Sequence, residues 1–236
     1  MNYSFEIIDF DSKLFGFKVA SITHVNNGEA AKLIEELKRS EVSYATYRLP
    51  SDNFLLIHQL EREGFVMLDG VVDLSVNIDN VTIGAVENNI RQAGAKDITQ
   101  LRKIAGEAFL LNRFYWDPVI PKDKAPIIYE QWIENSVLGK AADYVLISEV
   151  QGQITGFITL EKKGHIPLLA VSGEFQGKGL SRELLNAAFS KFQEWKVGKV
   201  TIATTLLNIQ AIRSYLTAGF TIIGSRFTFR WASKDV

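Results

Sequence analysis

Residues 1–79 alternate apolar and polar positions in short runs that are typical of strands, and two segments with helical periodicity interrupt them. From Glu29 to Arg39 the apolar residues recur every three or four positions, so they share one helix face. A second helix is expected from a cap at Ser51 or Asp52 to Glu63, closed by Gly64. Strands are expected at 5–9, 18–22, 44–49 and 66–78, the last as a strand pair or one long bent strand, with a loop at 11–17. This pattern predicts a small α/β unit.

Residues 80–96 carry five asparagine and glycine residues that favour turns, so we interpret them as a linker with an edge strand inside it. The chain is therefore expected to consist of a partial N-terminal domain at 1–79, a linker at 80–96 and a main domain at 97–236.

The main domain begins with a helix capped by Asp97 and continues through an aromatic loop at 112–118 to a helix at 124–138. Strands are expected at 144–149, 154–161, 166–171, 199–204 and 220–231, and helices at 180–195 and 209–216. The order ααβββαβαβ predicts an α/β (α+β) fold, with a mixed sheet flanked by helices.

One internal repeat stands out along the chain. Asn53 precedes Gly64-Phe65 by the same spacing that separates Asn208 from Gly219-Phe220, with a predicted strand before and after each segment. The small unit is either a partial copy of the main domain's second half or a chance recurrence of a common way to end a helix.

Composition narrows the class of protein. The chain has 236 residues, of which 47% are hydrophobic, enough for a sizeable core, and its formal net charge is −1, so we expect neither nucleic acid nor a membrane as a partner. It has no cysteine, and its three histidines do not stand at metal-ligand spacing, so no metal is expected. Neither a signal peptide nor an apolar run long enough for a bilayer is evident, which leads us to expect a cytoplasmic protein.

The segment with candidate chemistry follows the strand at 166–171, where Gln176-Gly177-Lys178-Gly179 opens a helix. The first turn of a helix has unpaired N–H groups and a partial positive charge, and glycine lets a pyrophosphate approach them closely. A tight strand-to-helix connection would need the same glycines for backbone freedom.

The order and spacing of these residues resemble the GNAT superfamily of N-acetyltransferases, whose cofactor signature is Arg/Gln-x-x-Gly-x-Gly/Ala. Gln176 and Gly179 match the signature, and Ser181 departs from it by one hydroxymethyl group. Asn208 and Tyr215, with the following Ala-Gly-Phe, resemble the superfamily's second motif, so the resemblance covers about 97–231. It implies the GNAT fold, with acetyl-CoA as co-substrate.

A second resemblance lies at residues 10–17, Phe-Asp-Ser-Lys-Leu-Phe-Gly-Phe, which are similar to a segment of bacterial dTDP-fucosamine acetyltransferases. Those enzymes carry a truncated GNAT-like N-terminal unit and acetylate the amine of dTDP-4-amino-4,6-dideoxygalactose. Phe10 stands where they have tryptophan, and Leu14 where an aromatic residue is common. The resemblance implies an amine acceptor on a nucleotide sugar.

The resemblance also implies roles for individual residues. Tyr215 would be the general acid that protonates the departing CoA thiolate, although a tyrosine there could instead pack on the helix's apolar face. Asn208 would bind the pantetheine amides, and it would also serve as an ordinary helix cap. The expected cofactor-binding residues are Leu169, Ala170, Val171, Gln176, Gly177, Lys178, Gly179, Leu180, Ser181 and Asn208. A general base is harder to assign. Glu161, His165 and Glu174 flank the strand, but a lone histidine or glutamate at a strand end is more often a solvated surface group, and a water chain could serve instead.

The acceptor is expected at the aromatic loop, where Arg113 could pair with a diphosphate and Phe114, Tyr115 and Trp116 could stack on a base or sugar. The aromatic residues could equally anchor the loop to the core. Two alternative functions stay open. The acceptor could be another small amine or a peptide N-terminus, or the protein could be a module that binds acyl-CoA without turnover. A homodimer would be compatible with an edge strand at 227–231, which could also be an interior strand.

Overall fold

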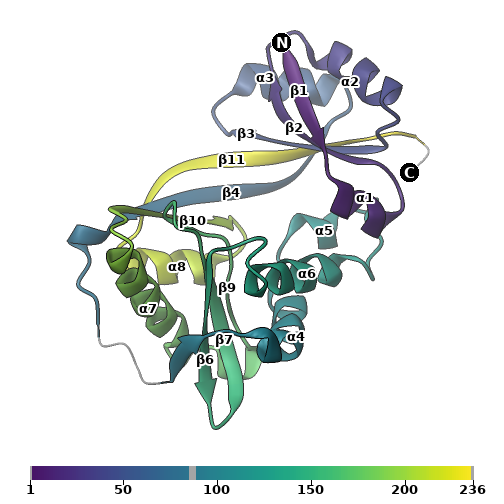
Figure 1. Ribbon diagram of the computed structural model, residues 1–236. Coiled ribbons are helices and arrows are strands. Elements are labelled where there is room, and N and C mark those ends of the chain that lie inside the picture. Colours follow the sequence, from purple (N-terminus) through teal and green to yellow (C-terminus); the bar gives the residue numbers. More distant parts are fainter. Residues whose placement is uncertain (1, 85–88, 235–236) are drawn as a thin grey trace. The chain divides into compact units, whose positions relative to one another are not determined.

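The computed structural model describes residues 2–84 and 89–234 (Figure 1). They form two compact units: Met1–Val71, Asn112–Ala125 and Gly224–Val236 in the first, and Val72–Leu111 and Pro126–Ile223 in the second. The expected domain boundaries, with an N-terminal domain ending at residue 79 and a main domain beginning at residue 97, stay a prediction.

The first unit is a sheet with helices on both faces. Its elements are β1 (Tyr3–Ile7), α1 (Asp9–Phe15), β2 (Val19–Val25), α2 (Ala30–Arg39), β3 (Tyr44–Pro50), α3 (Phe54–Arg62), α5 (Arg113–Trp116) and parts of β4 (Val66–Asn77) and β11 (Thr221–Ala232). The strand order is β1-β2-β3-β11-β4. α2 and α3 share one hydrophobic cluster with Ala45, Tyr47 and Phe229, which lie on one face of the sheet. Because β11 lies between β3 and β4, residues 227–231 form an interior strand, and dimerisation stays a prediction.

Two local expectations for this unit were wrong, and the structure decides between the two alternatives that the sequence left for a third segment. Residues 11–17 include most of the helix α1, which ends at Gly16 with a φ of 82°, instead of forming a loop. The cap of α3 is Asn53, whose side chain accepts a hydrogen bond from the Leu56 N–H at 3.3 Å, and not Ser51 or Asp52. Of the two alternatives for 66–78, the structure has one long strand.

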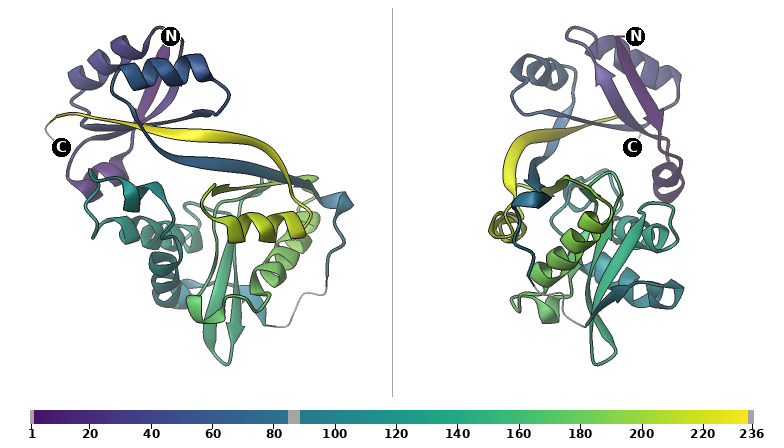
Figure 2. Two further views of the ribbon diagram at one scale, coloured as in Figure 1. Left: turned by 180° about the vertical axis from the view of Figure 1, so that it is seen from behind. Right: turned by 60° about the vertical axis from the view of Figure 1, so that its left-hand side comes forward.

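The second unit has an antiparallel sheet in the order β5-β6-β7-β9, and β10 lies between β4 and β8. Its elements are β5 (Ile90–Gln92), α4 (Ile98–Ala108), α6 (Ala125–Val137, from Pro126 on), β6 (Tyr144–Val150), β7 (Gln153–Leu160), β8 (His165–Ile166), β9 (Leu169–Val171), α7 (Leu180–Glu194), β10 (Lys199–Thr205) and α8 (Ile209–Thr217). Helices α4 and α7 cover opposite faces of β7, because Phe157 packs in the cluster of α4 and Ile158 in that of α7 (Figure 2).

Several local predictions for this unit are confirmed. The turn between β6 and β7 has a positive φ at Gln151 and Gly152, which suits a two-residue hairpin. The expected edge strand inside the linker is β5. The cap of α4 differs, because the side chain of Asp97 accepts from the Gly94 N–H at 2.8 Å and pairs with Arg91 instead of bonding to the helix's own N–H groups.

The two repeated segments have the same local geometry. Asn53 and Asn208 have similar backbone angles, and each side chain accepts a hydrogen bond from the N–H three residues on. Gly64 and Gly219 both have a positive φ just after the helix. The repeat is therefore a repeat of structure as well as of sequence.

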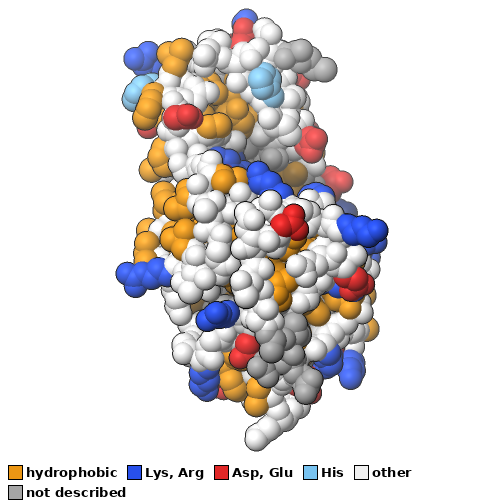
Figure 3. All heavy atoms as spheres, turned by 90° about the vertical axis from the view of Figure 1, so that its left-hand side faces the viewer, with side chains coloured by type: hydrophobic (Ala, Val, Ile, Leu, Met, Phe, Trp, Pro, Cys, Tyr) orange, Lys and Arg blue, Asp and Glu red, His pale blue; other side chains and the backbone are white. Residues whose placement is uncertain are grey.

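Large apolar side chains are exposed in both units, and Figure 3 shows such side chains on one face. Phe54 and Met67 of the first unit are 64% and 53% exposed, and Leu207 of the second is 58% exposed. None of the described helices has the length and apolar character needed to cross a membrane.

Candidate active site

The strand expected at 166–171 divides into two parts that pair with different partners. At its start, β8 runs parallel to β10, with His165 opposite Thr201. Beyond Pro167, β9 pairs with β7 instead, with Val171 opposite Gly156. Proline has no N–H to donate to a ladder, which favours a break at this point. The chain therefore diverges from β10 and leaves β9 at the edge of its own sheet.

One edge of β9 carries backbone groups that its sheet does not use. The Leu168 carbonyl accepts from the Thr159 N–H at 2.9 Å, and the Ser172 N–H donates to the Thr155 carbonyl at 2.8 Å. Because backbone groups alternate in direction along an antiparallel pair, those of Leu169 and Val171 point away from β7. This edge can receive an extended ligand as an additional strand.

The opposite edge of β9 is packed closely against β7. A Cβ on Gly156 would lie 2.7 Å from the carbonyl oxygen of Ala170, so a larger residue would push the two strands apart. Gly156 therefore helps to keep β9 in place.

The glycine turn follows β9 and leads into α7. Gly177 and Gly179 have φ values of 76° and 85°, and a Cβ on either would meet no heavy atom within 4 Å. Gly179 is the N-cap of α7 and provides no side chain to its first N–H groups. The turn is exposed, whereas Leu180 is buried in the core below it. The N-terminus of α7 is therefore open to an anion.

The side chains of this turn have local partners. Gln176 donates from Nε2 to the Val171 carbonyl at 3.3 Å, which ties the turn back to β9. The Nζ of Lys178 lies 4.7 Å from the centre of the Phe175 ring. Ser181 lies half-buried in the first turn of α7.

Asn208 and the glycine turn both follow the carboxyl ends of their strands. Strands β8 and β10 are parallel, so the turn and the residues after β10 both follow carboxyl ends, where open α/β sheets bind their ligands. The Asn208 side chain caps α8 by accepting from the Ala211 N–H at 3.1 Å. Its NH₂ group is a further donor, because the cap uses only the oxygen.

Tyr215 lies on α8 and is 5% exposed, within the cluster that includes Phe220, whose ring centre is 6.0 Å away. Burial raises the pKa of its hydroxyl well above the ordinary value. The packing role considered from sequence is therefore present, and the hydroxyl stays protonated at neutral pH.

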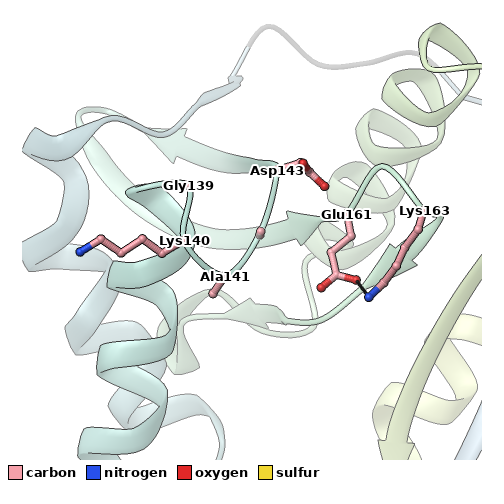
Figure 4. A pocket seen from close by; sticks show the side chains of 7 residues that line it. Gly139, Lys140, Ala141, Asp143, Glu161 and Lys163 are labelled. Carbon is pink, nitrogen blue, oxygen red and sulfur yellow. Dashed lines mark ion pairs between the residues drawn. The ribbon is translucent and has the colours of Figure 1, made fainter. Parts of the chain in front are cut away.

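The three candidate bases lie at different ends of the split strand. Glu161 pairs with Lys163 at 2.8 Å and lines a surface pocket of about 290 Å³ (Figure 4), and Nδ1 of His165 lies 3.0 Å from the Thr201 hydroxyl oxygen. Both lie at the strand's amino end, with His165 as the first residue of β8, whereas Glu174 follows its carboxyl end, next to the glycine turn. The pocket therefore lies at the other end of the strand from the turn.

Arg113, Tyr115 and Trp116 lie in the first unit, on the short helix α5, where a loop was expected. Trp116 is 53% exposed, whereas the neighbouring Phe114 is buried and anchors the segment, so the expectation that Phe114 could stack on the acceptor was wrong. The Arg113 guanidinium lies over the Phe114 ring, 4.4 Å from its centre. The residues expected to bind the cofactor belong to the second unit, whereas these three belong to the first.

Sequence reasoning missed a buried polar cluster in the first unit. Asp117 is 2% exposed, accepts from the Tyr44 hydroxyl at 2.9 Å, and forms an ion pair with Nε of Arg230 at 3.0 Å. Burial and the Asp117 charge raise the pKa of Tyr44. One signal could have found it, since an arginine between the apolar Phe229 and Trp231 needs a partner when its strand is buried.

The residues that the structure describes include no group of three or more histidine, aspartate or glutamate side chains placed to hold a metal ion.

Comparisons with known proteins agree with this geometry. A family model described as "Acetyltransferase (GNAT) domain" matches residues 123–233. The chain is 30% identical to an Escherichia coli dTDP-fucosamine acetyltransferase over 92% of both chains. It is 28% identical to the Bacillus subtilis "Spore coat polysaccharide biosynthesis protein SpsD" over 59% of this chain and 49% of that protein, so it matches about half of the latter's length.

Solved structures support the fold. A GCN5-related N-acetyltransferase from Sphaerobacter thermophilus has a TM-score of 0.68 and 13% identity, covering 98% of this chain and 76% of that one. A Staphylococcus epidermidis protein of unknown function has a TM-score of 0.67 and 16% identity, covering 94% and 88%. From the identity over nearly the whole chain, together with the split strand and the glycine turn, we conclude that this protein belongs to the GNAT family of acetyltransferases.

Proposed function

We propose that this protein moves the acetyl group of acetyl-CoA to the primary amine of a nucleotide-linked amino sugar. The observation that carries the proposal is the divergence of β9 from β10, with an exposed glycine turn at the carboxyl end of the split strand. This arrangement offers an edge for an amide-containing arm beside a helix N-terminus for its phosphates.

The glycine turn would hold the pyrophosphate of CoA. Residues 176–181 would surround it with backbone N–H groups, and the open space at Gly177 and Gly179 supports a close approach. A tight connection would need the same positive φ angles, but it would not need an exposed turn or a first helical turn free of a side-chain cap.

The pantetheine arm would lie along Leu169, Ala170 and Val171, where two residues direct their backbone groups away from β7. The free NH₂ group of Asn208 would bind an amide carbonyl of the arm from the other side. A backbone N–H of β9 would also polarise the thioester carbonyl.

The reaction requires two proton movements. The neutral amine attacks the thioester carbon, the C–S bond breaks, and the new ammonium gives up a proton while the CoA thiolate takes one. Tyr215 would supply the proton to sulfur, because burial keeps its hydroxyl protonated. Of the three flanking candidates, Glu174 alone follows the carboxyl end of the strand, so the amine's proton would leave through it or through water.

The proposed acceptor is based on the names of two relatives and on the side chains of α5. One relative is named for acetylating a dTDP sugar and another for polysaccharide biosynthesis. Arg113 would pair with the acceptor's diphosphate, and the exposed Trp116 and half-buried Tyr115 would stack on its base or sugar. A cytoplasmic location also stays part of this proposal.

Thiol release from acetyl-CoA, measured against amino-sugar nucleotides, amino acids, polyamines and peptides, tests the function. We expect turnover with an amino-sugar nucleotide. Turnover with only a small amine or peptide would support the alternative acceptor, and binding without turnover on any amine would support a non-catalytic module.

A further inference from the structure

The helix α5 depends on side chains at both of its ends. It has four residues, and backbone bonds at its two ends run from the Asp117 N–H to the Arg113 carbonyl, at 2.9 Å, and from the Tyr115 N–H to the Asn112 carbonyl, at 3.2 Å. The Asn112 side chain accepts from the Phe114 N–H at 2.8 Å, and Oδ1 of Asp117 accepts from the Val119 N–H at 3.1 Å. So short a helix has little stability of its own, so its position must come from such anchors.

Asp117 connects α5 to two paired strands. Tyr44 reaches it from β3 and Arg230 from β11, and the register places Tyr44 opposite Ala232, two residues from Arg230. Both partners lie on the sheet face opposite Tyr47 and Phe229, so they do not belong to the core under α2 and α3. A buried ion pair contributes little net stability after desolvation, so its clearest effect is to specify one geometry.

A chain of aromatic rings also connects Tyr44 to Arg113. The Tyr44 ring lies 6.2 Å from that of Phe17, which lies 5.8 Å from Phe15, and Phe15 lies 6.2 Å from Phe114. Arg113 then lies over Phe114. The rings of the N-terminal segment 10–17 and the carboxylate of Asp117 thus support the same short helix.

We propose that Asp117, with Tyr44 and Arg230, is a positioning residue that holds Arg113 in the orientation needed for the acceptor's diphosphate. Its 2% exposure prevents contact with the acceptor, so it acts through α5. The inference rests on the proposed function, because it gives Arg113 a ligand.

Hydrogen exchange tests the positioning without any acceptor. In Asp117→Asn and Tyr44→Phe we expect the amides of Phe114, Asp117 and Val119 to exchange about tenfold faster than in the parent, because local opening becomes easier. Tyr47→Phe is the matched control, since it removes the hydroxyl of a buried tyrosine from the same strand on the opposite face, and these amides should not change. Unchanged exchange in both test variants would overturn the proposal.

Kinetics then separate positioning from stability. Asp117→Asn should raise the acceptor's KM about tenfold, in line with the cost of a small misplacement, and leave the KM of acetyl-CoA unchanged. In an Arg113→Ala background the same substitution should add little, because it acts through that side chain. Asp117→Asn with Arg230→Gln removes the unpaired charge, so it should recover melting temperature but not acceptor KM.

The outcomes distinguish the two proposals. If Arg113→Ala raises the acceptor's KM and Asp117→Asn does not, the positioning role is wrong and the proposed function stands. If Arg113→Ala has no effect on an acceptor that is turned over, Arg113 has no diphosphate to bind, and the positioning role fails with it.

Discussion

Tyr215 of α8 and Leu60 of α3 occupy equivalent positions in the two repeated segments. The Phe220 N–H donates to the Tyr215 carbonyl at 3.0 Å, and the Phe65 N–H donates to the Leu60 carbonyl at 2.9 Å. Both side chains are buried. A leucine therefore satisfies the packing at such a position, and the hydroxyl is what distinguishes the copy in the second unit.

Replacing Tyr215 by phenylalanine isolates that hydroxyl. We expect Tyr215→Phe to keep its affinity for acetyl-CoA and to lower kcat by about a hundredfold, the low end of what a positioned acid contributes. Steady-state kinetics and calorimetry measure the two quantities. A kcat within a few-fold of the parent would leave Tyr215 with packing alone.

Gly179 tests the pyrophosphate site. Gly179→Asp should abolish acetyl-CoA binding, because it puts a carboxylate beside the N–H groups at the start of α7. Its φ of 85° strains any side chain, so Gly152→Asp, with a φ of 80° and equally open space, is the matched control. Calorimetry should show unchanged affinity in the control. Equal affinity in both folded variants contradicts the assignment.

Arg113→Ala tests the acceptor's diphosphate. The KM for a nucleotide-linked amino sugar should rise about 10- to 150-fold, which corresponds to a charged hydrogen bond worth about 1.5–3 kcal/mol. The KM for the free amino sugar and for acetyl-CoA should stay the same. Measuring both acceptors with both proteins completes a double-difference cycle, and equal effects on the two acceptors would remove Arg113 from the diphosphate site.

Asp97 predicts a pH-dependent contribution to stability. Its hydrogen bonds with Arg91 lower the pKa of its carboxyl to about 2, below the unfolded value of 3.8. The stabilisation is therefore complete above about pH 5 and is lost as the pH falls towards 2, so Asp97→Asn should cost about 2 kcal/mol at pH 7 and progressively less in acid. Denaturant unfolding at several pH values measures this.

The exposed Asp123 provides the control for that experiment, because its side chain is 75% exposed and Asp123→Asn should change stability little at any pH. A cost of Asp97→Asn that does not depend on pH would contradict the electrostatic origin.

Features that depend on neighbouring residues were predictable from the sequence. The turn at Gln151 and Gly152, the glycine start of α7 and the Asn208 cap each need only local backbone angles and nearby N–H groups, which residue type determines directly. The second motif, which includes Asn208 and Tyr215, could also be recognised, because its residues lie close together in the sequence and follow the first motif in the expected order.

Tertiary structure alone decided the short helices, the division of the strand at Pro167 and the polar cluster. Helices as short as α1 and α5 form because other elements pack against them, and the periodicity of so few residues does not reveal that. Tyr44 and Asp117 are 73 residues apart in the chain. Alternation along a strand tells which side chains are buried, but the side chain that meets a buried charge depends on which distant segment covers that face.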